Sequence, residues 1–100
     1  MDKIDYKTVD GDSAEGLAMH CIGMDYHKPY KRRGKLFYRP YRNYFSTARG
    51  GKYNSEWMEL VGKGYAKMRE SDRVYYFWLT RAGLDWLGER LGIKIYDEEK

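Results

Sequence analysis

The spacing of apolar residues predicts a helix near the start of the chain, over residues 13–22. Its apolar positions recur at helical spacing, which places them on one face: Ala14, Leu17, Ala18, Cys21 and Ile22. Asp12 and Glu15 are spaced as in a capping box, which satisfies free N–H groups at a helix start. Gly23 can adopt the left-handed conformation that ends many helices, so we expect the helix to stop there.

The second half of the chain predicts a helix, a hairpin and a second helix in that order. Ser55 is a good N-cap for a helix over 55–63. Its apolar face contains Trp57, Leu60 and Val61, and Gly62 and Gly64 end it. Two β-prone runs, 65–69 and 74–79, flank a polar connection and are expected to pair as a hairpin. Thr80 then caps a final helix, whose apolar stripe is Leu84, Leu87 and Leu91 and which ends at Gly92. Residues 93–96 can add a strand after this helix.

The remaining segments show no sustained period. Residues 1–11 alternate only at Ile4, Tyr6 and Val9, so they form either a short edge strand or a loose N-terminal arm. Residues 25–34 are polar and contain Pro and Gly, which predicts a surface loop. Residues 35–46 are β-prone, but Pro40 removes a backbone donor, so we expect an extended, irregular segment.

Composition fits one small α+β domain spanning residues 1–100. The chain has 100 residues, of which 42% are hydrophobic, enough for one core and too few residues for two. Trp57, Trp78 and Trp86 fall within or beside apolar stripes and are expected in that core. No apolar run is long enough to span a bilayer, and the N-terminus lacks the pattern of a signal peptide, so we expect a cytoplasmic protein.

Positive charge is concentrated in one third of the chain. The formal net charge is +4, yet residues 26–55 contain nine basic residues and no Asp or Glu, so the rest of the chain carries −5. Aromatic residues alternate with these cations, from Tyr26 to Tyr53. Cations neutralise phosphates and flat rings stack on bases, so this mixture predicts a nucleic-acid surface. The alternative is a solvated segment whose rings enter the core while Lys and Arg point to water.

The residues expected to contact nucleic acid come from this basic stretch and from the predicted hairpin. DNA is favoured over RNA as the ligand, and no cofactor is expected. The candidate contacts are Lys28, Lys31, Arg32, Arg33, Lys35, Tyr38, Arg39, Tyr41, Arg42, Arg49, Lys52, Lys67, Arg69 and Arg73. Arg39 and Arg42 can each bind a phosphate group through two parallel hydrogen bonds. Asn43 is expected to have a structural role, in which its side chain bonds its own backbone to hold a turn.

Two glycine-containing runs stand out in the second half of the chain: Leu60-Val61-Gly62-Lys63-Gly64-Tyr65 and Phe77-Trp78-Leu79-Thr80-Arg81-Ala82-Gly83-Leu84. Together they resemble the signature of bacterial winged-helix regulators. The resemblance spans residues 55–91 and implies a winged-helix-like domain: an N-terminal helix, a basic extended segment, a helix, a β-hairpin wing and a C-terminal helix. The helix before the wing departs from the regulator pattern, because Glu56 and Glu59 would be repelled by phosphates.

A second resemblance covers more of the chain. It rests on His20, Gly23 and Asp25, on the run Pro40-Tyr41-Arg42-Asn43-Tyr44-Phe45, and on the winged half. In these residues the chain resembles small phage and prophage proteins of unknown function. This resemblance implies a phage-encoded protein acting in the cytoplasm of a bacterial host, and it implies no reaction.

A catalytic or metal-binding role has less support in the sequence. His20, Cys21, Asp25 and His27 lie close together, and a mononuclear metal site using His20, Asp25 and His27 is geometrically allowed. The alternative is an ordinary helix C-terminus, where a histidine interacts with the helix dipole and Asp25 bonds local amides. Cys21 is the single cysteine and is expected to be a small buried group. We therefore expect no enzyme, no catalytic residues and no resident metal.

Two functions remain open from the sequence. The first is a small nucleic-acid-binding regulatory protein of phage type. The second is a protein-interaction module whose basic stretch docks on an acidic host protein and inhibits or redirects it. A monomer is the default expectation, because few residues are left for a dimerisation helix.

Overall fold

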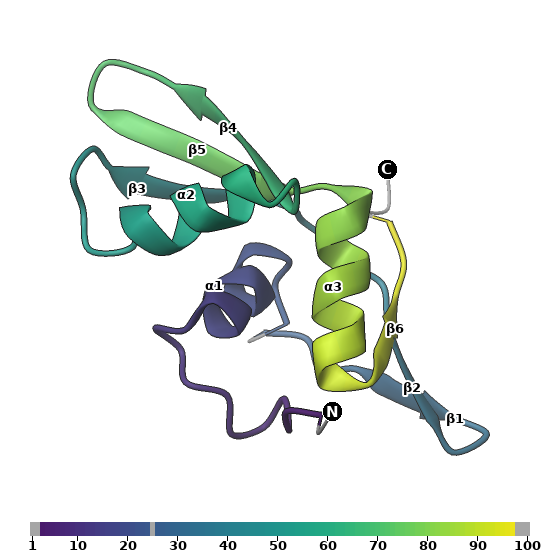
Figure 1. The fold of residues 1–100 in the computed structure, drawn as a ribbon. Helices are drawn as coiled ribbons and strands as arrows, with labels where there is room; N and C mark the ends of the chain where they lie inside the picture. Colours follow the sequence, from purple (N-terminus) through teal and green to yellow (C-terminus); the bar gives the residue numbers. More distant parts are fainter. Residues whose placement is uncertain (1–2, 25, 98–100) are drawn as a thin grey trace.

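The computed structural model describes residues 3–24 and 26–97. It contains three helices and two small three-stranded sheets (Figure 1). The fold is α+β, as the sequence predicts. No helix within the described residues is long and apolar enough to cross a membrane.

The first helix, α1 (Ala14–Cys21), lies where the apolar spacing predicts it, but its cap is different. The side chain of Ser13 accepts a hydrogen bond from Gly16 N at 3.1 Å, whereas the Asp12 carboxylate faces Lys52 and Tyr53 instead. The capping-box prediction for Asp12 is therefore wrong by one residue. Gly23 has a φ of 80°, as expected for the residue that ends the helix.

Residues 30–38 form a hairpin where the sequence predicts a loop and an irregular segment. Strands β1 (Tyr30–Arg32) and β2 (Lys35–Tyr38) pair antiparallel around Arg33 and Gly34. Both turn residues have positive φ, 52° and 77°, which matches the right-handed twist of a two-residue hairpin. Pro40 lies just beyond β2, so it interrupts no ladder.

The first sheet is completed by a strand from the other end of the chain. Strand β6 (Ile93–Ile95) runs parallel to β2, giving the order β1–β2–β6. The predicted strand after the last helix is thereby confirmed. The helix before this strand is α3 (Arg81–Leu91). It begins with the Thr80 side chain accepting a hydrogen bond from Gly83 N and ends at Gly92, which has a φ of 70°, as predicted.

The second sheet has the order β3–β5–β4 and contains the predicted hairpin. Strand β3 (Phe45–Ala48) pairs with β5 (Val74–Leu79), which also pairs with β4 (Ala66–Glu70). Helix α2 (Asn54–Gly62) covers one face of this sheet, where the Trp57 ring stacks on Phe77 at 5.1 Å. The helix begins after Tyr53, so the predicted Ser55 cap is wrong; the Ser55 hydroxyl faces Glu56 instead.

The core lies where α1, α2 and α3 meet the inner faces of the two sheets. Residues 3–12 pack against it without forming a strand among themselves: Ile4 N donates to Arg90 O at 2.8 Å, and Ile4, Tyr6 and Val9 are half-buried against the core. The β1–β2 hairpin and the β4–β5 hairpin point to opposite ends of the molecule (Figure 1).

Candidate nucleic-acid interface

The sheet β1–β2–β6 has one face on α3 and one face toward solvent. Leu36 and Tyr38 of β2 point inward with Ile93 and Ile95 of β6, which are buried. Side chains alternate along a strand, so the outward positions are those between them. The register aligns Tyr30, Phe37 and Lys94 across the three strands on the outer face.

A row of three aromatic rings crosses this outer face. Tyr30 lies nearly parallel to Phe37 with 5.7 Å between ring centroids, and Phe37 lies nearly parallel to Tyr96 at 6.3 Å. Tyr96 follows β6 and is fixed to the sheet because its N–H donates to Tyr38 O at 3.0 Å. Tyr30, on the edge strand, is 47% exposed. Its ring is therefore open to a planar group from solvent.

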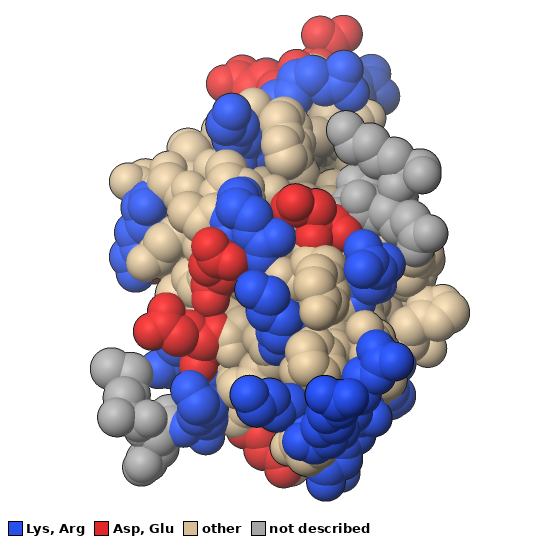
Figure 2. Space-filling model, turned by 90° about the vertical axis from the view of Figure 1, so that its right-hand side faces the viewer, with Lys and Arg blue, Asp and Glu red and all other residues tan. Residues whose placement is uncertain are grey.

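Basic side chains surround this aromatic row. Arg32 and Lys35 face each other across the hairpin, and Lys94 lies beside Phe37 in the register. The Arg39 guanidinium sits 4.7 Å above the Tyr96 ring, a cation–π distance. Figure 2 shows Lys and Arg side chains gathered at the lower end of this side of the molecule, where the hairpin lies in Figure 1.

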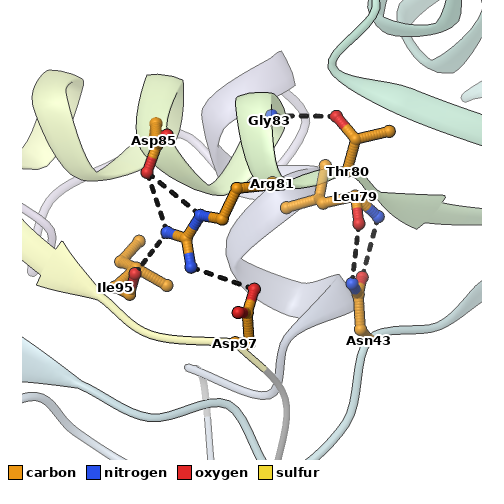
Figure 3. A network of polar contacts seen from close by, with 8 residues as sticks. All are labelled: Asn43, Leu79, Thr80, Arg81, Gly83, Asp85, Ile95 and Asp97. Atoms are coloured by element: carbon orange, nitrogen blue, oxygen red, sulfur yellow. Dashed lines mark hydrogen bonds and ion pairs between the residues drawn. The ribbon is translucent and has the colours of Figure 1, made fainter.

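An ion-pair network holds the end of β6 in place (Figure 3). Arg81, the first residue of α3, donates to Asp85 at 2.8 Å, to Asp97 at 3.0 Å and to the carbonyl oxygen of Ile95. Asp97 directly follows Tyr96 in the chain. Because its carboxylate is bonded to Arg81, its negative charge near the aromatic row is partly neutralised.

Among the residues predicted to contact nucleic acid, Lys31, Arg32, Arg33, Lys35 and Arg39 are brought together on this sheet and its hairpin. All five are exposed. Lys28 is also exposed, and it lines a cavity of about 420 Å³ beside α1 rather than the sheet.

Tyr38 does not belong to the interface, and the prediction that it contacts ligand is wrong. Its side chain is 2% exposed and its hydroxyl donates to Ile22 O at 2.9 Å. The sequence reasoning chose the wrong member of an alternating pair, because Phe37 and Tyr38 point to opposite faces of β2.

Tyr41 and Arg42 support the end of α1 instead of joining the aromatic row. Arg42 donates to the carbonyl oxygen of His20 at 2.7 Å, and its guanidinium lies 5.1 Å from the Tyr26 ring and 5.6 Å from the Tyr41 ring. The Tyr41 ring lies so close to Gly23 that an added Cβ there would overlap it. Both residues therefore have a structural use.

Arg49 and Lys52 lie in the second half of the fold and are paired with carboxylates. Arg49 is 3.9 Å from Glu70 and its guanidinium is 5.3 Å from the Tyr75 ring. Lys52 is 3.1 Å from Asp12. The predicted basic stretch is thus divided by the fold: its residues from Lys31 to Lys35 lie on the β1–β2 hairpin, whereas Arg49 and Lys52 lie between β3 and α2. Lys67, Arg69 and Arg73 are exposed on the β4–β5 hairpin.

The contacts of Asp12 with Tyr53 and Lys52 lead to a prediction about the pH dependence of stability. The Tyr53 hydroxyl, bonded to Asp12 at 2.9 Å, and then Lys52 lower the pKa of Asp12 below its ordinary 3.8. Because the folded pKa is the lower one, this contact stabilises the fold above pH 3.8 and the contribution disappears as the pH falls through the folded pKa. An NMR titration of the Asp12 carboxyl is expected to show this, with Tyr53→Phe raising the pKa. An unchanged pKa in Tyr53→Phe would contradict it.

Four residues of the outer face are not among the individual contacts expected from the sequence: Tyr30, Phe37, Lys94 and Tyr96. A signal for two of them was present, since Tyr30 and Phe37 alternate with cations in a β-prone stretch. Lys94 and Tyr96 gave no such signal, because their place beside β2 depends on a parallel pairing between distant parts of the chain.

The suggested metal site receives no support from the described part of the chain. Within it, no group of three or more His, Cys, Asp and Glu residues is placed to hold a metal ion. His20 faces Phe45 with 5.7 Å between ring centroids, and His27 faces Tyr41 at 4.5 Å. Asp25 lies outside the described residues. Cys21 is buried, with its thiol 3.3 Å from the Asn43 side-chain oxygen.

Comparison with known proteins adds no further information about the site. Neither the family models, the curated proteins nor the solved structures contain a match to this chain.

Proposed function

We propose that the protein binds single-stranded nucleic acid on the outer face of the β1–β2–β6 sheet. The observation that carries the proposal is the row formed by Tyr30, Phe37 and Tyr96 among basic side chains. Bases stack on aromatic rings whatever their sequence, and cations track the phosphates. The same face therefore offers both kinds of contact that a single strand needs.

Single strands are favoured over duplex because of the exposed surface of α2. We propose a winged-helix-like arrangement for the second half of the fold, supported by the order β3–β5–β4 and by α2 preceding the β4–β5 hairpin. In that arrangement α2 would be the helix that enters a major groove. It carries Glu56 and Glu59, with Glu59 exposed, so phosphates would repel it.

The biological setting that we propose is regulatory, in a phage-type protein, and DNA is favoured as the ligand. Aromatic stacking does not itself distinguish DNA from RNA, since a ribose is recognised through its 2′-hydroxyl. Both must therefore be measured.

The test is fluorescence anisotropy of labelled single-stranded DNA, RNA and duplex DNA at two salt concentrations. Single strands are expected to bind most tightly, with affinity falling as salt rises because phosphate contacts release counterions. Tyr30→Ala is expected to weaken binding about tenfold, within the roughly 1–3 kcal/mol measured for stacked bases. The matched control is Tyr26→Ala, which removes a tyrosine that is 66% exposed and outside the row, and should leave the affinity unchanged.

A second pair of variants separates charge from stacking. Arg32→Ala with Lys35→Ala should reduce the slope of log affinity against log salt by about 0.7 for each phosphate that the variant no longer neutralises. Absence of binding to all three ligands at low salt would contradict the proposal. The basic hairpin would then be better explained by the protein-interaction alternative, and a pull-down of acidic host proteins would follow.

A further inference from the structure

The outer face of the β3–β5–β4 sheet carries a second set of aromatic and basic side chains. Helix α2 covers the other face, where Trp57 packs on Phe45 and Phe77. In the register of the hairpin, Lys67 pairs with Trp78 and Arg69 pairs with Tyr76, on the face that α2 does not cover. The sequence predicts Trp78 in the core, but the structure leaves it half-buried on this face.

The side chains on this face are arranged for stacking and for anion contact. The Arg69 guanidinium lies 4.9 Å from the Tyr76 ring, and Tyr44 lies 5.6 Å from the same ring. Tyr44 is 52% exposed. The acidic residue of β4, Glu70, pairs in register with Tyr75 and lies near Arg49, on the opposite face. The charged side chains of the two paired strands on this face, Lys67 and Arg69, are thus both basic.

The two outer faces are joined by a short piece of chain. Strand β2 ends at Tyr38 and β3 begins at Phe45. Arg39 contacts the aromatic row of the first sheet, and Tyr44 contacts Tyr76 of the second. The five steps between these residues span at most about 18 Å even when fully extended. The near ends of the two faces are therefore close enough for one flexible strand to reach both.

We infer that Tyr44, Tyr76 and Trp78, with Lys67 and Arg69, form a second binding surface for the same single strand of nucleic acid. The inference rests on the proposed function, because the strand is first bound at the β1–β2–β6 sheet. Linking two contacts on one ligand makes the second contact intramolecular. A longer oligonucleotide is therefore expected to bind much more tightly than a short one.

The experiment compares an oligothymidylate of about 6 nucleotides with one of about 30 nucleotides. One single-strand-binding fold covers roughly 4–16 nucleotides, so the short oligonucleotide can occupy one surface only, whereas the long one can reach both. Affinity is measured by anisotropy and base contact by tryptophan fluorescence. Trp57 is 0% exposed and Trp86 stacks on Tyr65. Quenching by the long oligonucleotide is thus expected to come from Trp78, and Trp78→Phe should remove it.

Charge variants assign each contact to its surface. Lys67→Ala with Arg69→Ala should lower affinity for the long oligonucleotide by about tenfold or more, because the intramolecular second contact is removed, and should leave the short one unchanged. Arg32→Ala with Lys35→Ala should weaken both. If the wild-type protein binds both lengths equally and Trp78→Phe leaves the quenching intact, the second surface is excluded while the proposed function stands. If neither length binds, the proposed function itself fails.

Discussion

Replacing Gly83 with alanine is expected to lower the free energy of unfolding by about 3 kcal/mol, near the upper end of the usual cost of overpacking. Gly83 lies in the first turn of α3, and an added Cβ would overlap the carbonyl oxygen of Tyr65. That carbonyl cannot move freely, because it accepts a hydrogen bond from Thr80 N at 3.0 Å. The new methyl group would therefore push α3 away from the segment before β4.

The matched control is Gly62→Ala, at the last residue of α2. An added Cβ there meets nothing within 4 Å, and alanine favours helix over glycine by up to about 1 kcal/mol. Urea unfolding followed by circular dichroism is expected to show a lower midpoint for Gly83→Ala and an equal or higher one for Gly62→Ala. Equal midpoints for the two variants would show that α3 has room to shift, contrary to this prediction.

The same contact gives a physical reason for one of the sequence motifs. Thr80 and Gly83 belong to the run from which a winged-helix-like domain is expected. In the structure Thr80 caps α3 by accepting from Gly83 N, and its hydroxyl also donates to Gly64 O at 2.7 Å. Glycine at position 83 lets the helix start approach the Tyr65 backbone closely. The motif therefore specifies a junction between helix and hairpin, whatever the ligand.

Elements with local signals are predicted well from the sequence. Thr80 and Gly92 bound α3 as expected, and the turn before Val74 joins two strands of one hairpin. Such features depend on residues a few positions apart, so pattern and capping are sufficient to find them. The same reasoning places the helix caps Asp12 and Ser55 incorrectly: the neighbouring Ser13 caps α1, and α2 begins after Tyr53 without a side-chain cap.

The first sheet and much of the candidate interface could not be predicted in the same way. The parallel pairing of Leu36 with Ile93 joins distant parts of the chain, and no local pattern encodes it. Charge density correctly marks the β1–β2 hairpin as basic, but it cannot show that Arg49 and Lys52 belong to the other half of the fold. It also cannot decide which ring of Phe37 and Tyr38 faces solvent, because that depends on the side of the sheet that α3 covers.

Asn43 shows how a correctly predicted role can have an unexpected partner. The sequence predicts a structural residue that bonds its own backbone, but the Asn43 side chain bonds both backbone groups of Leu79 (Figure 3). The register of β3 with β5 pairs Phe45 with Phe77, so its continuation would place residue 43 opposite Leu79. The backbone turns toward α1 instead, with Tyr44 N donating to Cys21 O at 3.0 Å. The Asn43 amide thus takes the place of a strand residue.

Asn43→Ala is therefore expected to lower the free energy of unfolding by about 2–4 kcal/mol, because two backbone groups are left unpaired. Leu79 N–H and C=O each lose a partner at 2.8 Å, and leaving a buried polar group unpaired costs about 1–3 kcal/mol. Asn43→Asp is the matched variant, because a carboxylate still accepts from Leu79 N but faces the Leu79 carbonyl without a proton to donate. The destabilisation should be of similar or larger size at neutral pH, because a charged oxygen then faces the Leu79 carbonyl oxygen, and it should shrink as the carboxyl becomes protonated.

Hydrogen exchange gives the measurement that separates this role from a general loss of stability. In Asn43→Ala, exchange of the Leu79 amide should accelerate by a larger factor than exchange of the Phe77 amide. Phe77 lies in the middle of the sheet, paired with Phe45 of β3 and with Met68 of β4. In Asn43→Asp the Leu79 amide should stay protected, since its acceptor remains. Equal acceleration at Leu79 and Phe77 in Asn43→Ala would mean that the whole sheet opens together, and that the Asn43 side chain does not replace a strand residue at this edge of β5.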